Sequence, residues 1–227
     1  MRTSLIWDLP TRLFHWLLVA GLVVQYVTAE WLDDAMQWHF YAGYFLLGLL
    51  FFRFCWGFLG PEYARFRSFI TGPRQVWRYS RQILSRHSVA HAGHNPLGGW
   101  MVLIMLILVA LQATSGLFMT DNVFMQGPWY HVVSSQTQSL MSFIHHQSFN
   151  VLLAIIALHI AAIGFYTFYK RQPLVAAMFH GKKVTPSTPI PSSRLILAVV
   201  LALISAALTY YIVAVAPGAP AEQEVYY

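Results

Sequence analysis

Five long stretches without an acidic or basic side chain constrain this sequence more than any other feature. They cover residues 13–29, 35–52, 95–120, 122–169 and 195–216. A helix needs about 20 mostly apolar residues to cross a lipid bilayer, so the pattern predicts five membrane-spanning helices. The fourth stretch is too long for one helix and opens with polar, turn-forming residues. We therefore expect the fourth helix to begin near Leu140.

The composition excludes several classes of protein. Only 10% of the 227 residues are charged, whereas a soluble domain carries about 25%. A disordered chain, a nucleic-acid-binding domain and an ordinary soluble enzyme are therefore excluded. The single cysteine, Cys55, rules out a disulfide framework and a cysteine-held iron–sulfur cluster. The sequence has no Cys-x-x-Cys-His motif, so no c-type haem is covalently attached.

The basic residues indicate an orientation in the membrane. All 14 lysines and arginines lie at the N-terminus, at the end of the second span, or in the connections after the second and fourth spans. Basic residues mark the cytoplasmic side. We therefore expect a multi-pass protein of the bacterial inner membrane, with a cytoplasmic N-terminus and a periplasmic C-terminus. A linker rich in Pro, Ser and Thr, residues 182–193, sets the fifth span apart as an appended helix.

Four histidines lie at membrane depth, where an ionisable side chain is costly and points to function. His15 is near the cytoplasmic end of the first span, and His39 opens the second span on the outer side. His145 and His159 lie 14 residues apart in the fourth span, so they share a helix face and are separated by about 21 Å along the axis. The neighbouring His146 points about 140° away from His159.

Matching these depths gives two histidine pairs. His39 and His145 lie near the outer surface, and His15 and His159 lie in the cytoplasmic half. Two pairs at two depths, contributed by three helices, are what two bis-histidine haems require. The alternative, that each histidine is a hydrogen-bonded packing residue, fits any one of them better than it fits all four. No carboxylate lies at these depths, and this absence argues against a zinc or di-iron site.

Several polar residues near the cytoplasmic side are candidate binding residues. Arg53 lies 14 residues after His39 on the same helix face, so it either pairs with a haem propionate or quinone, or extends to the interface. Arg12 is a weaker candidate for the same role. His94 and Asn95 open the third span and either bind a quinone or, for Asn95, cap the helix before Pro96.

Two glycines within the spans allow two interpretations of their role. Gly43 and Gly116 lie within the second and third spans, where the absence of a side chain lets a haem or a neighbouring helix approach the backbone. Helix packing is the commoner use of such glycines.

The sequence resembles the bacterial cytochrome b561 family, which includes the b-type cytochrome subunits of nickel–iron hydrogenases. The resemblance covers roughly residues 7–183 and rests on the segments WDLPTRLFHW (7–16), HFYAGY (39–44), RFCWGFLGP (53–61), GHNPLG (93–98) and MFHGK (178–182), together with the stretch 145–159. It implies an all-α membrane protein in which a four-helix bundle, residues 1–183, holds two b-type haems. The ligand positions of the family fall on the same histidines, with His39 and His145 for the outer haem and His15 and His159 for the inner one. Residues 184–227 would add the linker, a fifth transmembrane helix and a periplasmic tail.

The expected function is electron transfer across the membrane. A bis-histidine haem has no open iron position and so carries electrons. We expect a periplasmic redox partner, either a hydrogenase-type enzyme or a c-type cytochrome, at one end and the quinone pool at the other. A stand-alone quinone or superoxide oxidoreductase, a haem-free anchor and a histidine-relay transporter are the alternatives.

Overall fold

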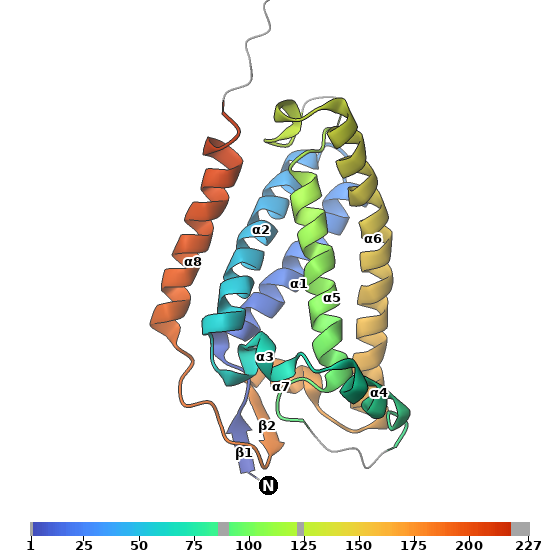
Figure 1. Cartoon of the computed structure of the whole chain (residues 1–227), viewed down its shortest axis with the longest axis vertical. Helices are drawn as coiled ribbons and strands as arrows, with labels where there is room; N and C mark the ends of the chain where they lie inside the picture. Colours follow the sequence, from blue (N-terminus) through green and yellow to red (C-terminus); the bar gives the residue numbers. More distant parts are fainter. Residues whose placement is uncertain (1, 86–90, 122–124, 219–227) are drawn as a thin grey trace, which may run out of the picture.

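The structure, a computed structural model, describes residues 2–85, 91–121 and 125–218. Within these residues five helices are long and apolar enough to cross a membrane, which confirms the predicted number of spans. They are α1 (Leu9–Glu30), α2 (Met36–Leu59), α5 (Pro96–Gly116), α6 (Ser135–Gly164) and α8 (Leu195–Tyr210). Two π-helical segments, η3 (Phe165–Tyr169) and η4 (Tyr211–Val215), continue α6 and α8 (Figure 1).

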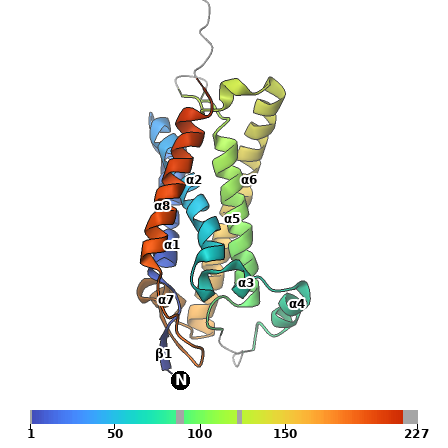
Figure 2. The same cartoon turned by 60° about the vertical axis from the view of Figure 1, so that its left-hand side comes forward.

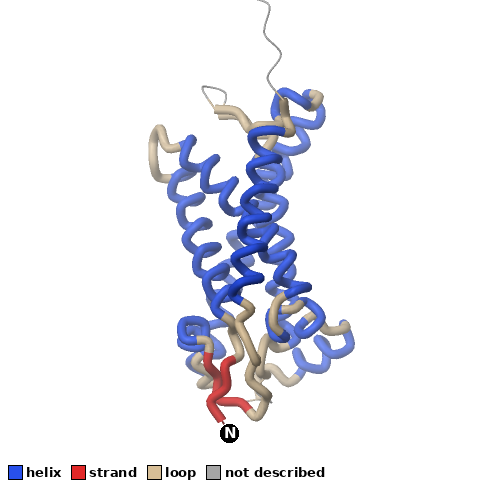
Figure 3. Tube along the Cα trace, turned by 90° about the vertical axis from the view of Figure 1, so that its left-hand side faces the viewer, coloured by secondary structure: helices blue, strands red, loops and turns tan. Residues whose placement is uncertain are grey.

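The shorter elements gather mainly at one end of the bundle. This end carries β1 (Arg2–Leu5), η1 (Glu62–Ala64), α3 (Phe66–Phe69), α4 (Pro73–Arg81), α7 (Leu174–His180) and β2 (Lys182–Thr185), as Figure 3 shows. We call it the basic end and define it as residues 2–12, 62–85 and 170–194. The short helix η2 (Tyr130–Val132) lies at the opposite end, defined as residues 30–39, 117–121 and 125–138.

The fourth spanning helix begins earlier than the sequence analysis predicts. It starts at Ser135 instead of near Leu140. The oxygen of the Ser134 side chain accepts a hydrogen bond from the backbone N–H of Thr137 at 3.4 Å, which satisfies one of the free donors of the first turn. The polar residues therefore form the first turns of the helix.

The bundle is built from helix pairs. α1 packs on α2, α5 packs on α6, and α2 also contacts α5, while α8 lies along α2 and α1 on the side away from α6 (Figures 1 and 2). Buried apolar side chains from α1, α2, α5, α6 and α8 form one core: Phe14, Leu18, Leu46, Phe52, Trp56, Leu108, Val109, Leu152, Ala198 and Leu201. The fifth helix therefore contributes to the same core as the other four.

A buried polar cluster fixes the start of α1. Asp8 caps the helix, since its carboxylate accepts the backbone N–H of Thr11 at 2.9 Å and the hydroxyl of Thr11 at 2.7 Å. The indole N–H of Trp56 in α2 donates to the same carboxylate at 3.1 Å. Pro10 occupies the first turn, where it costs no hydrogen bond. These contacts tie the basic ends of α1 and α2 together.

A two-stranded sheet joins the start of the chain to the segment after α7. β1 pairs antiparallel with β2, with Arg2 opposite Thr185 and Leu5 opposite Lys182. Gly181, which ends α7, has a φ of 81°, and a side chain there would lie 2.6 Å from the carbonyl oxygen of Trp7. Only glycine fits this backbone conformation and spacing without strain. The sheet therefore ties the start of the chain to the segment that follows α7.

Candidate functional site

Two of the predicted histidines lie next to each other toward the opposite end of the bundle. The ring of His39, in the first turns of α2, has its centroid 6.4 Å from that of His145 on α6, and the ring planes lie at 73°. His146, the next residue, is exposed, and its Nδ1 lies 2.8 Å from the carbonyl oxygen of Ser142 on its own helix. His145 and His146 therefore point to different sides of α6, as helical periodicity predicts.

Hydrogen bonds hold the orientation of both rings. Nδ1 of His39 lies 3.1 Å from the carbonyl oxygen of Gln25 in α1, which can only accept, so this nitrogen carries the proton. Nδ1 of His145 lies 3.0 Å from Oγ of Ser115 in α5, and that hydroxyl donates to the carbonyl of Leu111. Ser115 therefore accepts from His145. Both rings are left with an unprotonated Nε2, the form in which imidazole binds a metal.

A glutamine on α5 supports the helix turn that carries His145. The Gln112 amide donates to the His145 carbonyl at 2.5 Å and to the Ser148 hydroxyl at 2.7 Å. Gly116, one turn further along α5, faces the same ring: a Cβ there would lie 3.4 Å from Cε1 of His145. A methyl group at this position would make an ordinary van der Waals contact with the imidazole. Gly116 thus faces a histidine and not a neighbouring helix backbone.

The second predicted pair lies toward the basic end. His15 lies in the first turns of α1 and His159 in the last turns of α6, and both side chains are half-buried. The His15 ring packs edge-on against Trp16, with centroids 4.9 Å apart. Its Nδ1 is buried and has no hydrogen-bond partner among the described residues. Among the described residues, no hydrogen bond to Nδ1 therefore fixes the His15 ring as it does the rings of His39 and His145.

Arg53 is buried among aromatic side chains and is not exposed at the surface of the protein. Only 3% of its surface is exposed, and its guanidinium lies 4.8 Å from the ring centroid of Phe66 and 5.9 Å from those of Phe14 and Phe69. Its Nη1 has no partner among the described residues. A buried, unsatisfied guanidinium is costly and points to an anionic or carbonyl partner.

Arg12 has a structural contact of its own. Its guanidinium donates to the carbonyl of Phe179 in α7, while its buried Nε has no partner among the described residues. One face of this side chain therefore anchors α7 to α1, and the other retains a donor.

His94 and Asn95 have separate roles at the start of α5. The Asn95 side chain caps the helix by accepting the backbone N–H of Gly98 at 2.7 Å. The ring of His94 lies between those of Trp7 and Phe69, each centroid 4.7 Å away, and its Nδ1 is buried without a partner among the described residues. Burial, followed by the charges of Arg53 and Lys183, lowers the pKa of His94 to about 3. His94 is thus neutral at physiological pH.

Lys183 fixes the loop that leads to His94. Its ammonium group donates to the carbonyl of Ala92 at 3.0 Å and to that of Gly93 at 3.2 Å. Burial lowers the pKa of Lys183 to about 8. Because Lys183 belongs to β2, the sheet at the basic end positions the first residues of α5.

Sequence reasoning missed the residues that orient the histidines: Gln25, Gln112, Ser115 and Lys183. Two of them carried a usable signal. Gln112 and Ser115 are polar side chains within an apolar span and are three residues apart, hence on one helix face. Gln25 acts through its backbone carbonyl, so its side chain gave no signal. Lys183 had none, because its role depends on the sheet pairing.

Fold and site together define a class. The chain is a multi-pass helical membrane protein in which half-buried histidines of two helices, His39 and His145, lie next to each other. A family model for prokaryotic cytochrome b561 matches residues 6–181, more than half of the sequence. The chain therefore belongs to the prokaryotic cytochrome b561 family and is a membrane b-type cytochrome of electron transfer. The histidine-relay transporter and the haem-free anchor are accordingly excluded.

The chain is also similar to a curated protein. The chain is 24% identical over 208 residues to a protein of Azotobacter chroococcum mcd 1 described as a probable Ni/Fe-hydrogenase B-type cytochrome subunit, and the match covers 78% of this chain and 86% of that protein. No solved structure matches the chain significantly.

Proposed function

We propose that this chain holds two b-type haems and carries electrons across the bacterial inner membrane. His39 and His145 would ligate the outer haem, and His15 and His159 the inner one. A periplasmic redox protein, either a hydrogenase-type enzyme or a c-type cytochrome, would exchange electrons at the outer haem, and the quinone pool at the inner one. The arrangement of His39 and His145 carries the proposal.

The spacing of this pair suits a single iron atom. A metal bonded at about 2 Å to one nitrogen of each ring requires ring centres roughly 6 Å apart, and the observed separation is 6.4 Å. Among the described residues, no three or more His, Cys, Asp or Glu side chains are grouped so that they could hold a metal ion. A pair alone suits a metal that brings four equatorial nitrogens with it, as haem iron does, better than zinc, which takes three or four protein ligands.

The surrounding residues match what each ligand must do. Gln25 and Ser115 keep the proton of each outer imidazole on Nδ1, so that Nε2 is available for binding. Haem supplies reversible one-electron chemistry when bound. Two protein ligands leave the iron no open position, so the site favours electron transfer over oxygen chemistry.

Polar residues near the basic ends of α2 and α5 support a quinone site beside the inner haem. The unsatisfied Nη1 of Arg53 is a donor, and Nδ1 of His94 is one when it carries the ring proton. A propionate or a quinone carbonyl would accept a hydrogen bond from either nitrogen. Because His94 is neutral, it would act there through a hydrogen bond and not as a cationic acid. The side-chain oxygen of Asn95 already accepts a hydrogen bond that caps α5, which makes His94 the stronger quinone candidate of the two. Arg12 adds a further donor toward a propionate.

The orientation follows from the distribution of charge. The basic end carries arginines and lysines, and the connection between α1 and α2 carries Asp33 and Asp34 instead. The positive-inside rule assigns the basic end to the cytoplasm. A reporter fusion after residue 218 tests this: alkaline phosphatase, which is active only in the periplasm, should be active there, and an active cytoplasmic reporter at that position would reverse the assignment.

Haem stoichiometry tests the ligand set. The purified chain should contain two b-type haems, and chains with alanine at His39 or His145 should contain one. A hydrogen-driven quinone reduction assay with a co-purified partner then tests the electron path. Two haems without quinone activity would keep the cytochrome and reject the quinone link.

A further inference from the structure

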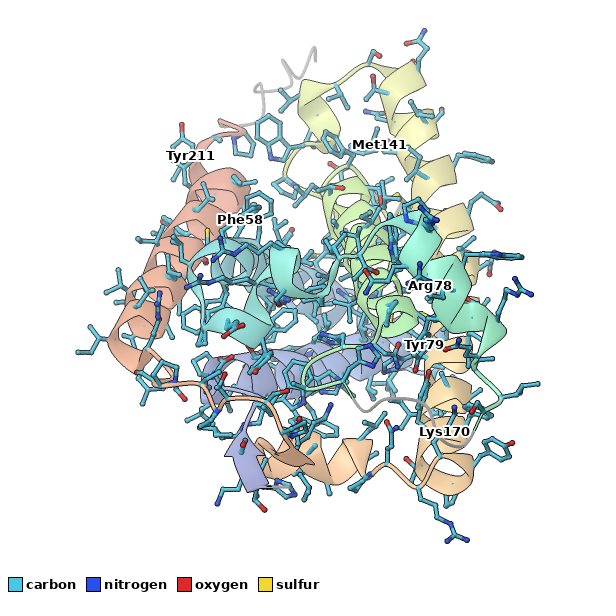
Figure 4. All side chains as sticks on the ribbon, turned by 60° about the horizontal axis from the view of Figure 1, so that its bottom comes forward. Phe58, Arg78, Tyr79, Met141, Lys170 and Tyr211 are labelled. Carbon is cyan, nitrogen blue, oxygen red and sulfur yellow. The ribbon has the colours of Figure 1, made fainter. Side chains whose placement is uncertain are left out.

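The helix α4 lies outside the bundle, beside the basic ends of α5 and α6 (Figures 1 and 2). Two contacts hold it there. The hydroxyl of Tyr79 lies 2.9 Å from that of Tyr166 in η3, and the indole N–H of Trp100 in α5 donates at 2.9 Å to the carbonyl of Thr71, just before α4. Figure 4 shows Arg78 and Tyr79 on this helix, with Lys170 at the nearby end of η3.

An open apolar groove separates α4 from α5. Its lining residues are Pro73, Val76, Trp77, Ser80 and Trp100. Trp77 is 67% exposed although it is a large aromatic side chain. Trp100 lies in the first turns of a helix that is apolar enough to span the membrane. Tryptophan concentrates at the level of the lipid headgroups, so the groove opens where hydrocarbon and headgroups meet.

A row of cations borders this groove. Arg74, Arg78 and Arg81 are all exposed, and their spacing of four and three residues places them along one side of α4, next to Trp77. The sequence has no acidic residue between Glu62 and Asp121, so no carboxylate from this stretch can neutralise them. A guanidinium binds a phosphate oxygen pair better than any other side chain does.

We propose that α4 and α5 form a binding site for an anionic glycerophospholipid. One acyl chain lies in the groove against Trp77 and Trp100, and the phosphate headgroup contacts Arg74, Arg78 and Arg81. A zwitterionic lipid fits the groove equally well but brings its own positive charge to the arginines, so the site selects anionic headgroups. The site would bind this lipid whichever haems or partners the protein uses.

The site connects to the bundle through Tyr79. Its partner, Tyr166, lies two helical turns after His159 on the same continuous helix. A lipid that holds α4 in place therefore also restrains the end of α6. We expect the bound anionic lipid to raise the thermal stability of the purified protein.

Native mass spectrometry of the full chain, purified in detergent and mixed with phosphatidylglycerol or phosphatidylcholine, tests the site. The wild type should retain phosphatidylglycerol preferentially. A chain with Arg74→Gln, Arg78→Gln and Arg81→Gln should lose roughly tenfold or more of this retention. A chain with Arg67→Gln, Arg171→Gln and Lys182→Gln loses the same charge from exposed positions at the same end, outside α4, and should retain the lipid.

Two further measurements separate the headgroup from the acyl chain. Trp77→Ala should weaken retention of long-chain phosphatidylglycerol while preserving the preference over phosphatidylcholine. If the triple arginine variant fails to fold, as shown by circular dichroism, Arg78→Gln alone should give a smaller loss. Equal losses in the α4 and control variants, no preference between the two lipids, or displacement of the lipid by a quinone would each overturn the proposal.

Discussion

The two histidine pairs differ in how far the protein alone completes them. At the His39–His145 pair, Gln25 and Ser115 bind Nδ1 of each ring. Near the His15–His159 pair, Nδ1 of His15, Nη1 of Arg53 and Nδ1 of His94 are buried without hydrogen-bond partners among the described residues. Each such atom costs stability unless something binds it. On the proposed function, the His39–His145 pair would be a preformed outer site, and the unpartnered atoms near His15 and His159 would receive haem propionates and a quinone.

The largest expected effect is the loss of one haem. His145→Ala or His39→Ala should reduce the haem content from two per chain to one, because a single imidazole cannot hold the outer haem in a bis-histidine site. His15→Ala or His159→Ala should remove the inner haem instead. A pyridine haemochrome assay on each purified variant gives the count, and redox titration identifies which haem remains.

His146→Ala is the matched control for His145→Ala. Its ring is exposed, and its contacts with the Ser142 carbonyl and the His145 ring lie on its own helix, so both haems should remain. Loss of a haem here would show that the neighbouring residue is the ligand. Loss of both haems in all four ligand variants would contradict two separate sites.

A smaller effect should follow from removing a support of one outer ligand. Ser115→Ala deletes the acceptor for Nδ1 of His145, and loss of such a partner typically weakens metal binding by 10-fold or more. We expect the outer haem to be lost more readily on dilution, while the inner haem is unaffected. Thr114→Ala is the control, because it removes a neighbouring hydroxyl that donates to carbonyls of its own helix.

Arg53 should affect the inner haem and not the outer one. Arg53→Met removes a buried positive charge that favours the reduced, more negative haem. We expect the midpoint potential of the inner haem to fall by an amount on the order of 50 mV, which corresponds to roughly a tenfold change for one electron. Potentiometric titration resolves the two haems. An equal shift of both potentials, or no shift, would remove Arg53 from the inner site.

The smallest effect concerns the pH dependence of stability. The pKa of His94 is lowered from 6.5 to about 3 in the folded chain. Below pH 6.5 the unfolded chain therefore binds a proton that the folded chain does not, so the free energy of unfolding falls as the pH drops through this window. His94→Gln should lose less thermal stability than the wild type between pH 7 and pH 5. Parallel losses in the two proteins would show that His94 does not titrate in this way.

The spanning helices were predictable because a helix that crosses a lipid bilayer must be a long apolar run, and such runs are visible in the sequence alone. Helical periodicity was also sufficient to separate His145 from His146. The start of α6 was predicted too late, because Ser134 caps a helix whose first turns are polar. The pairing of β1 with β2 was not predictable, since it joins segments about 180 residues apart and depends on the tertiary fold. The contact of Lys183 with residues 92 and 93 follows from that pairing and was equally hidden.

The haem content and spin state of the purified wild-type chain test the central claim most directly. Two haems per chain are expected, both giving the low-spin electron paramagnetic resonance signals of iron with two imidazole ligands. A single haem, or a high-spin signal from iron with one protein ligand, would contradict the paired-histidine account.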